Sequence, residues 1–224
     1  LPDNYLKCNY NDNIYHKEQY YSELTFHYWF WKNRLENEKN KWVGFCQKRR
    51  IWTVEEVLSN KINKDDIEKI MLKNTLEEWK NYEAIICKPI NVFPVKKMKL
   101  IKRGFRSIIK DPSILFDVSK QSVLLHFDMH HGFGNLEKAI HCMSTKDKND
   151  FYDYVKKSTK FNPHIMYISK PVILKKSFSD LFNWLEQYET LFDKKELVGY
   201  DTGRLFAYLA ERYASFWFKK YTKF

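Results

Sequence analysis

The sequence feature that most constrains the fold is an aromatic segment between Lys17 and Asn33. Leu24, Tyr28 and Trp31 recur in it at the spacing of one helix face, and few of the other positions are purely polar. This pattern predicts a helix that is buried on most of its circumference. Such a helix needs a large core around it, and a chain of 224 residues is long enough to bury about 70% of the surface of its unfolded state.

The rest of the chain is predicted to alternate between strands and helices. Strands are predicted over residues 42–46, 83–89 and 165–169, and helices over residues 64–79, 151–155, 171–192 and 203–218. Other segments are predicted as a loop over residues 34–41, a helix through Val57-Leu58 capped by Thr53, and a mobile loop or short helix over residues 96–111. Residues 113–136 have no clear pattern. The alternation favours an α/β sandwich, and the lack of repeats or linkers favours a single domain over residues 1–224.

The charge balance is basic, with 39 Lys and Arg residues against 28 Asp and Glu residues and a formal net charge of +11. Such a chain suits polyanionic partners, namely nucleic acid, an anionic membrane face or phosphorylated substrates. Only seven of the cations are Arg, and bidentate reading of bases or phosphates favours Arg over Lys. A solvated lysine surface is the simplest interpretation, and we expect no nucleic-acid partner. A basic nucleic-acid-binding module with stacking Tyr and Trp side chains is the alternative.

Cysteine usage and hydropathy indicate a cytoplasmic protein. Cys8, Cys46, Cys87 and Cys142 are far apart and form no Cys-x-x-Cys pair, which excludes a zinc ribbon and gives no sign of a secreted disulfide framework. No apolar stretch approaches the roughly 20 residues of a membrane span, so membrane contact is expected only at the periphery, on the inner face. The first residue is Leu1 rather than Met, which predicts that the natural chain begins earlier.

The sequence His126-Phe-Asp128-Met-His130-His131 gathers several groups that bind metals or protons. On a strand, His126, Asp128 and His130 would share one face and form a plausible metal-ligand set. On a helix, His126 and His130 would still be neighbours. No further ligand follows at a recognisable spacing, so a metal-free role, in which Asp128 and His131 contact an acceptor or a phosphate, is preferred to a metal site. A structural role is the remaining interpretation.

The common phosphate-binding loops are missing from the sequence. Gly132-Phe133-Gly134 lacks the third glycine of a dinucleotide fingerprint, because Glu137 stands in its place. A Gly-x-x-x-x-Gly-Lys-Ser/Thr sequence does not occur, which excludes a P-loop nucleotidase.

Two charged pairs are candidates for binding and catalysis. Arg49 and Arg50 follow the predicted strand over 42–46, and the carboxyl ends of strands are where ligands bind in open α/β sheets. Glu211 and Arg212 lie in an otherwise aromatic helix, where adjacent side chains point about 100° apart and are predicted not to pair. Because an unpaired buried charge is costly, each is expected to find a partner elsewhere, Glu211 with one of the arginines, or to serve in a catalytic cleft.

Four blocks of sequence occur in one order: Asp12-Asn13-Ile14, Ser22–Asn33, Trp42–Arg50 and Tyr208–Arg212. With these blocks the chain resembles a family of bacterial capsular and exopolysaccharide glycosyltransferases that is catalogued as a domain of unassigned function. The resemblance covers nearly the whole chain. It departs from the family pattern at Gln47-Lys48, where the family has His-Tyr, and at His164-Ile165-Met166-Tyr167, where the family usually has Asn-Met-Phe-Ile.

The resemblance implies a glycosyltransferase A-type fold, in which a Rossmann-like α/β sandwich with a mixed central sheet and flanking helices holds a nucleotide-sugar. The chain is expected to begin after the first strand of that sheet. The implied activity is sugar transfer from a nucleotide-sugar, most simply a UDP-sugar, to a cell-surface polysaccharide or glycan, with a glycan or lipid-linked glycan as acceptor. A metal is not required by this scheme, and Mn²⁺ or Mg²⁺ is the alternative. A degenerate transferase that acts as a scaffold is the second interpretation.

The resemblance also implies roles for residues near the start of the chain. Asp12 and Asn13 would lie near the nucleotide. Glu23 and Lys32 would hold the first helix against the nucleotide site.

The remaining implied roles concern charge and proton transfer. Arg49 and Arg50 would stand where other transferases of this fold keep a metal-binding acidic pair, and two guanidinium groups can neutralise a leaving diphosphate without a metal. Glu211 is then the candidate base for the acceptor hydroxyl, with Arg212 orienting it or meeting a phosphate. The predicted catalytic residues are therefore Glu211 and Asp128.

Overall fold

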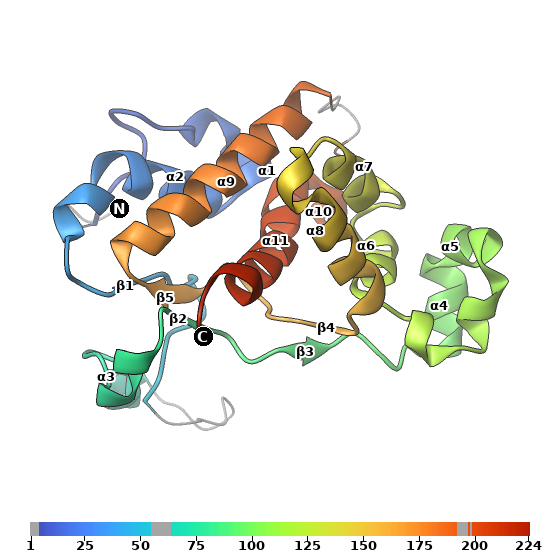
Figure 1. The fold of residues 1–224 in the computed structure, drawn as a ribbon, viewed down its shortest axis with the longest axis horizontal. Helices are drawn as coiled ribbons and strands as arrows, with labels where there is room; N and C mark the ends of the chain where they lie inside the picture. The colour runs from blue at the N-terminus through green and yellow to red at the C-terminus, as the bar shows by residue number, and fades with distance from the viewer. Residues whose placement is uncertain (1–4, 55–63, 192–196, 198) are drawn as a thin grey trace.

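The computed structural model describes residues 5–54, 64–191, 197 and 199–224 (Figure 1). The helix predicted through Val57-Leu58 lies outside these residues. The α-helices are α1 (Glu18–Tyr21), α2 (Leu24–Asn33), α3 (Lys64–Ile70), α4 (Lys97–Arg103), α5 (Phe105–Lys110), α6 (Val123–His131), α7 (Asn135–His141), α8 (Thr145–Lys157), α9 (Pro171–Thr190), α10 (Tyr200–Gly203) and α11 (Leu205–Tyr221). The 3₁₀ helices are η1 (Tyr15–Lys17), η2 (Leu35–Glu38), η4 (Glu77–Asn81), η5 (Pro112–Leu115) and η6 (Val118–Lys120). The strands are β1 (Val43–Gly44), β2 (Ala84–Ile86), β3 (Ile90–Asn91), β4 (Lys160–Phe161) and β5 (Tyr167–Ser169).

Helix α11 runs through the middle of the molecule, and α1, α8 and α9 pack against it (Figure 1). Its aromatic and aliphatic side chains are buried on nearly every face, as its sequence predicts. Tyr21 of α1 stacks on Phe206 with ring centroids 4.6 Å apart. The helix predicted over 203–218 is therefore confirmed, with a break at Arg204 that separates α10 from α11.

The main sheet has three strands in the order β1-β5-β2, and β5 is antiparallel to both neighbours. Gly44 and Ile85 both pair with Ile168. A Cβ at Gly44 would lie 3.1 Å from the Ile168 side chain, so glycine permits the close approach of β1 to β5. Because β1 and β2 run in the same direction, their carboxyl ends meet at the edge where β5 begins.

The predicted α/β class is confirmed, but the sheet differs from the predicted mixed arrangement. Strands β3 and β4 form a second, two-stranded antiparallel sheet. Every strand pair among the described residues is antiparallel. Helices supply most of the buried surface, because the strands are only two or three residues long.

The predicted aromatic helix over 17–33 is interrupted. Ser22 has a φ of +50°, which ends α1, and α2 begins two residues later. The Ser22 hydroxyl donates to the Glu23 carboxylate at 2.6 Å. Within α2, Leu24 and Trp29 are fully buried, and the Trp29 indole donates to the Tyr10 carbonyl at 3.1 Å. The deep burial that the sequence predicts is thus confirmed for this helix.

Other predicted elements are shorter or more regular than expected. The helix predicted over 64–79 ends at Ile70, because Leu72 instead hydrogen-bonds to the Trp52 carbonyl. The segment 96–111 forms two helices, α4 and α5, which meet at Gly104. A Cβ at Gly104 would lie 2.7 Å from the Leu100 carbonyl oxygen, so the turn between the two helices needs glycine.

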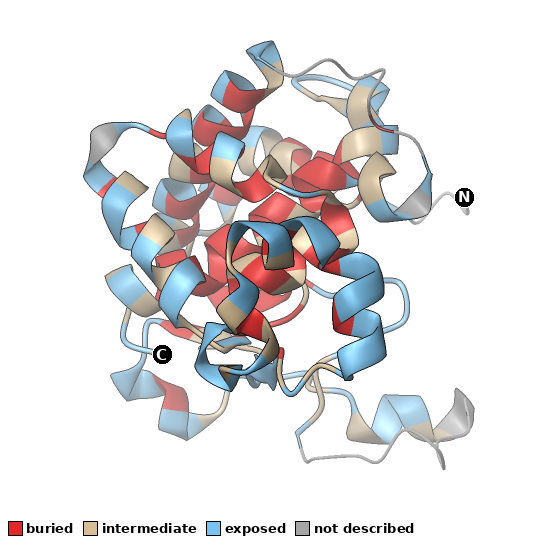
Figure 2. Cartoon of the chain, turned by 90° about the vertical axis from the view of Figure 1, so that its right-hand side faces the viewer, coloured by how far each residue is buried: buried red, intermediate tan, exposed pale blue. Residues whose placement is uncertain are grey.

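Two separate hydrophobic clusters hold the helices together. The larger cluster surrounds α9 and α11 and includes most of the buried aromatic residues. The smaller cluster joins α4 and η5 to α6 through Leu100, Ile114, Leu125 and Met129. Figure 2 shows this side of the molecule, with the buried core behind largely exposed helices. The α4–α5 pair therefore packs on the body through only a few apolar contacts.

Candidate functional site

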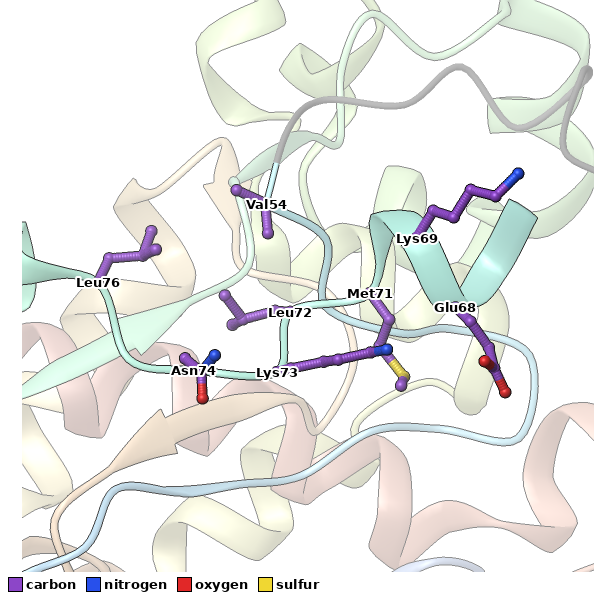
Figure 3. A pocket seen from close by; sticks show the side chains of 8 residues that line it. All are labelled: Val54, Glu68, Lys69, Met71, Leu72, Lys73, Asn74 and Leu76. Atoms are coloured by element: carbon purple, nitrogen blue, oxygen red, sulfur yellow. The ribbon is translucent and has the colours of Figure 1, made fainter. Parts of the chain in front are cut away.

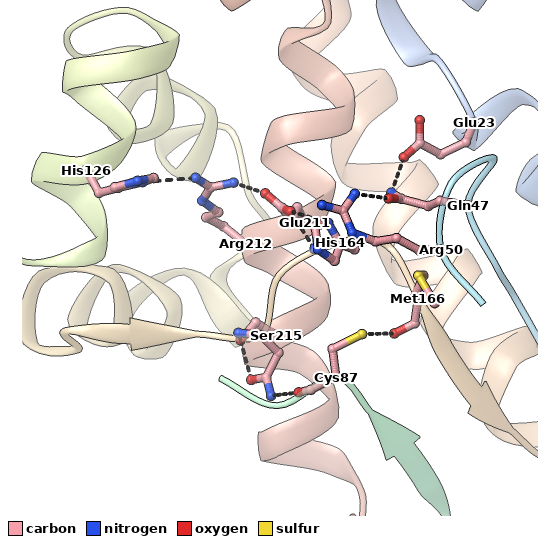
Figure 4. A network of polar contacts seen from close by, with 11 residues as sticks. Glu23, Gln47, Arg50, Cys87, His126, His164, Met166, Glu211, Arg212 and Ser215 are labelled. Atoms are coloured by element: carbon pink, nitrogen blue, oxygen red, sulfur yellow. Dashed lines mark hydrogen bonds and ion pairs between the residues drawn. The ribbon is translucent and has the colours of Figure 1, made fainter. Parts of the chain in front are cut away.

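The carboxyl ends of β1 and β2 and the segment leading into β5 lie together at one edge of the main sheet, opposite the middle of α11. Figure 4 shows the polar side chains of this region, from His126 on α6 across α11 to Glu23 beside α2. We call this set, His126, Arg212, Glu211, His164, Arg50, Gln47 and Glu23, the sheet-edge network. Its members come from five separate parts of the chain, so only the tertiary fold assembles them.

A tight turn after β1 carries the two predicted arginines. Gln47 and Arg50 bond to each other through both backbone N–H groups, at 3.2 and 3.0 Å. The Gln47 amide donates to the Glu23 carboxylate at 2.6 Å, and Arg50 donates to the Gln47 side-chain oxygen at 3.5 Å. Gln47, which departs from the family pattern, thus connects the first helices to the turn. Glu23 thus holds this turn against the start of α2.

Arg49 and Arg50 are exposed at the tip of this turn. Neither forms an ion pair with an acidic residue in the part of the chain that the structure describes. The predicted position just past a strand's carboxyl end is confirmed. Two exposed guanidinium groups there are available to an anionic ligand.

His164 faces this turn from the segment before β5. It has a φ of +67°, in the left-handed region that residues other than glycine rarely adopt. Its backbone N–H donates to the Glu211 carboxylate at 2.5 Å, and its Nδ1 lies 3.9 Å from the same oxygen. Burial lowers the pKa of His164, the positive charge of Arg50 lowers it further, and Glu211 opposes both effects. Such strain recurs at functional sites.

Hydrogen bonds of Asn162, two residues earlier in the chain, help to fix the position of His164. The Asn162 amide donates to the Cys87 carbonyl at 2.6 Å, just past β2. The Ser215 hydroxyl of α11 donates to the Asn162 side-chain oxygen at 2.8 Å and accepts from the Asn162 backbone N–H at 2.9 Å. These bonds tie the end of β2, the approach to β5 and α11 into one rigid unit.

Glu211 and Arg212 form an ion pair, so the prediction that they do not pair is wrong. The side chains leave the helix in different directions, but the long guanidinium arm reaches back to the carboxylate. Arg212 is 1% exposed, and its guanidinium lies over the Phe161 ring at 4.1 Å. Burial lowers the pKa of Arg212, and Glu211 opposes this. The pairing provides the partner that a buried charge requires.

The second guanidinium nitrogen of Arg212 lies 3.2 Å from Nδ1 of His126 on α6. His126 stacks on His130 with ring centroids 4.5 Å apart, because both lie on α6, so of the two arrangements considered for this segment the helix is the one that forms. Burial and the Arg212 charge lower the pKa of His126 to about 2. His126 is therefore neutral at pH 7 and able to accept a hydrogen bond from Arg212.

His131 points away from the sheet-edge network. Its ring stacks on Tyr208 at 3.7 Å, and its Nδ1 bonds to the Asp201 carbonyl at 3.0 Å. Burial, followed by the charge of Arg212, lowers the pKa of His131 to about 3. These contacts give His131 a packing role between α6 and α10.

Asp128 also lies away from the sheet-edge network. It accepts hydrogen bonds from the Gly134 N–H at 3.0 Å and from the Ser107 hydroxyl at 3.4 Å. Gly134 has a φ of +78°, so the carboxylate stabilises a left-handed turn between α6 and α7. Burial raises the pKa of Asp128 to about 6. These contacts separate Asp128 from Glu211, with which the sequence analysis grouped it as a catalytic pair.

The described residues contain no cluster of three or more His, Cys, Asp or Glu side chains that could hold a metal ion. The set of His126, Asp128 and His130 considered from the sequence does not form, because these residues lie on a helix and Asp128 faces Gly134 instead.

The predicted site residues nearest the start of the chain have mainly local contacts. The Asn13 amide donates to the Asn11 carbonyl at 2.8 Å, and the Asp12 carbonyl accepts from Asn33 at 2.8 Å. Burial and the Asp12 carboxylate raise the pKa of Tyr28 to about 12. Lys32 lies 3.9 Å above the Trp31 ring. The contacts of Asp12, Asn13 and Lys32 are thus with α2 and the segment before it.

A pocket of about 510 Å³ lies elsewhere, between α3 and the segment that follows it (Figure 3). Its lining mixes apolar and charged side chains: Val54, Glu68, Lys69, Met71, Leu72, Lys73, Asn74 and Leu76. The lining includes none of the predicted site residues.

The chain belongs to the family described as a domain of unknown function, DUF4422, whose pattern matches residues 1–222. Comparison with curated proteins gives no match. The solved structure described as the WbbM bifunctional glycosyltransferase apo structure has the same fold, with a TM-score of 0.68 and 19% sequence identity. The likeness covers 95% of this chain and 36% of that chain, so this chain spans about a third of the larger protein.

Within the described ranges, no helix combines the length and apolar character that a bilayer span requires.

His164 was not predicted as a site residue from the sequence. A partial signal exists for His164, because Asn162-Pro163 before it favours a turn. No local signal indicates that this turn faces Glu211, since 47 residues separate the two.

Proposed function

We propose that the protein is a glycosyltransferase that moves a sugar from a nucleotide-sugar, most simply a UDP-sugar, to a glycan or lipid-linked glycan acceptor. The observation that supports this most is the placement of Arg50 beside His164, which bonds to Glu211, with the exposed Arg49 next to it in the same turn after β1. The fold shared with a bifunctional glycosyltransferase supports it independently. A glycosyltransferase A-type arrangement and a role in cell-surface polysaccharide synthesis belong to the same proposal.

In the proposed site, Arg49 and Arg50 bind the diphosphate of the donor. Their exposed planar guanidinium groups can each donate two hydrogen bonds to phosphate oxygens. As the bond from the anomeric carbon to the diphosphate breaks, the electron pair stays on the diphosphate. Two cations at that point stabilise the developing charge without metal participation, although Mn²⁺ or Mg²⁺ could serve the same end.

Glu211 is the proposed base. The acceptor hydroxyl oxygen bonds to the anomeric carbon, and its proton passes to the Glu211 carboxylate. Arg212 pairs with this carboxylate from the buried side, and the His164 backbone N–H holds its other oxygen. These two contacts fix the orientation of Glu211, whose side chain keeps 16% of its surface exposed. Arg212 is therefore a positioning residue in this scheme.

Donor binding can be measured by thermal shift with uridine, guanosine, cytidine and thymidine diphosphates, each with and without manganese. A nucleotide present at 100 times its Kd stabilises the native state by about 2.7 kcal/mol. Uridine diphosphate is expected to raise Tm most. Arg49→Ala and Arg50→Ala should each weaken binding by about tenfold to a hundredfold, since each removes a charged hydrogen-bond donor.

Arg34→Ala is the matched control, because Arg34 is equally exposed but lies at the end of α2. Equal affinity in the Arg34, Arg49 and Arg50 variants would overturn the diphosphate role. An increase in Tm that occurs only when manganese is present would contradict the metal-free scheme and indicate a metal-dependent one. No shift with any diphosphate would favour the scaffold interpretation.

The base can be tested through donor turnover. Glu211→Gln should retain uridine diphosphate affinity while lowering the transfer or hydrolysis of the UDP-sugar by about 10² to 10⁴. Unchanged turnover in this variant would exclude Glu211 as the base.

A further inference from the structure

The segment from α4 to η6, residues 96–120, exposes several large apolar side chains to solvent. We call it the α4–η6 surface. Phe116 is 86% exposed and Met98 is 77% exposed. Ile101, Phe105, Ile109 and Val118 are exposed as well. Large exposed apolar patches mark interaction sites on folded proteins, and this segment concentrates exposed apolar side chains.

The exposed apolar side chains follow helical spacing. Met98 and Ile101 are three residues apart on α4, and Phe105 and Ile109 are four apart on α5, so each pair lies on one helix face. The opposite side of α4 is occupied, because Leu100 is 1% exposed and packs in the smaller hydrophobic cluster. Helix α4 therefore packs on the body through one apolar side, while α4 and α5 expose other apolar side chains to solvent.

The same segment is strongly basic. No acidic residue occurs between residues 96 and 110, which contain Lys96, Lys97, Lys99, Lys102, Arg103, Arg106 and Lys110. Arg103 lies 3.8 Å from Asp201, and Lys110 lies 3.2 Å from Glu137. The others form no ion pair with an acidic residue in the described part of the chain.

The acidic residues at the end of this surface are already engaged. Asp111 pairs with Lys120 at 2.7 Å, and Asp117 accepts from the Ser119 hydroxyl at 2.6 Å. Apart from Arg103 and Lys110, the cations of α4 and α5 therefore have no acidic partner among the described residues, and they are interspersed with apolar groups. The two helices protrude from the body of the molecule, at the far right in Figure 1.

We propose that the α4–η6 surface docks on an anionic lipid bilayer, with its apolar side chains in the headgroup region and its lysines on the lipid phosphates. Amphipathic helices that combine basic and aromatic or aliphatic residues bind membranes in this way. A second copy of this chain would bring like charges together. A nucleic acid would satisfy the lysines but leave Phe116 and the isoleucines in water.

This inference goes beyond the proposed transfer reaction and does not depend on it, because vesicle binding requires no donor. It connects to the site through packing. Helix α4 contacts α6, and α6 carries His126, which bonds to Arg212. A transferase with a lipid-linked acceptor would gain from such docking, but a protein with no transferase activity would bind vesicles equally well.

The test is flotation of the full chain with vesicles of phosphatidylcholine alone, or of phosphatidylcholine mixed with phosphatidylglycerol, at low and high salt. Binding is expected only with phosphatidylglycerol and should weaken with salt. The triple variant Lys97→Glu, Lys99→Glu and Lys102→Glu should bind at least about 100-fold more weakly, because each lysine near an anionic surface contributes about one kcal/mol. Its matched control reverses the charge of the exposed Lys7, Lys39 and Lys138.

A second pair of variants tests the apolar part. Ile109→Ser with Phe116→Ser should weaken vesicle binding by about tenfold or more, through the lost burial of apolar surface. Val172→Ser with Leu191→Ser is the control, since these residues are similarly exposed, at 72% and 73%, near the start of α9 and just past its end. Circular dichroism of each variant would show that the fold is retained.

Several results would overturn the proposal. Equal vesicle binding by the lysine variant and its control would show that charge acts without regard to position. Equal binding by the two serine variants would show that no side chain inserts. Binding of a DNA or RNA duplex without binding of phosphatidylglycerol vesicles would assign the surface to nucleic acid.

Discussion

Two regions distribute charged and apolar side chains in opposite ways. The interface of α6 with α11 buries a charge, whereas the α4–η6 surface exposes apolar groups. The interface buries Arg212, which pairs with Glu211 and contacts His126. The α4–η6 surface leaves Phe116 and Met98 in the open beside uncompensated lysines. Each arrangement runs against the usual distribution of residue types. The buried charges at the interface of α6 with α11 are stabilised by pairing within the chain. Most cations of the α4–η6 surface have no acidic partner among the described residues, so this surface suits an external partner.

The largest effect on stability is expected at Arg212. Arg212→Met would leave Glu211 partly buried with no cation, and losing one partner of a buried pair costs about 3–5 kcal/mol. Urea unfolding at pH 7 would measure the loss. Adding Glu211→Gln should restore part of the stability. A loss below about 1 kcal/mol would show that this pair behaves like an exposed one and would break the comparison.

The next effect is a loss of stability in acid. Burial lowers the pKa of His27 to about 4, of His131 to about 3 and of His126 to about 2, against an ordinary value of 6.5. Below pH 6.5 the unfolded chain takes up protons that the folded chain does not. The free energy of unfolding should therefore fall with decreasing pH, by up to about 4 kcal/mol per pH unit for three such groups.

Urea midpoints between pH 7 and pH 5 would check this prediction. His126→Gln should reduce the slope by about a third, because it removes one of three groups. His141 is exposed, so His141→Gln is the control for replacing a histidine on the surface. A midpoint that is constant over this range would contradict the buried neutral state of these histidines.

Asp128 should have the opposite effect on the pH dependence of the free energy of unfolding. Burial raises its pKa from 3.8 to about 6, so the folded chain binds the proton more tightly, and stability falls as pH rises from about 4 to 6. Asp128→Asn keeps an oxygen for the Gly134 N–H and removes the charge. The variant should gain stability relative to the parent at pH 7, by at most about 3 kcal/mol, and little at pH 4. Asp153→Asn, at an exposed position, is the control, and an equal gain at both pH values would refute the raised pKa.

The smallest effect on stability is expected on the α4–η6 surface. Phe116→Ser should change the free energy of unfolding by less than about 0.5 kcal/mol, because the side chain packs against little of the protein. The same substitution is expected to weaken vesicle binding. A stability loss above about 2 kcal/mol would mean that Phe116 is buried in solution and would remove the contrast between the two regions.

Much of the fold could be predicted from local pattern. The aromatic spacing of residues 17–33 and 203–218 indicates buried helices, and both segments are largely helical. The interruption at Ser22 was not predicted, because neither glycine nor proline marks it, and the break at Arg204 was not predicted although Gly203 precedes it. Helices α4 and α5 were only partly anticipated, since their apolar residues face both inward and outward and leave no clear period.

The candidate site was predictable only in part. Arg49 and Arg50 follow a strand in sequence, so their place at the sheet edge could be derived. Asp128 was grouped with Glu211 by residue type alone, and the structure directs it to the turn at Gly134 instead. The contact of Arg212 with His126 joins residues 86 apart, which no local spacing encodes.

Local pattern alone indicates that residues 17–33, 171–192 and 203–218 are largely helical, that residues 96–120 are basic and apolar, and that an arginine pair follows β1. These properties depend on side chains that are neighbours along the chain, where helix and strand geometry relates sequence spacing to position. Only the tertiary structure decided that Glu211 pairs with Arg212, that His164 faces them and that Asp128 does not. Those outcomes depend on how α6, α11 and the segment before β5 pack, because a buried charge takes whichever partner the packing brings within reach.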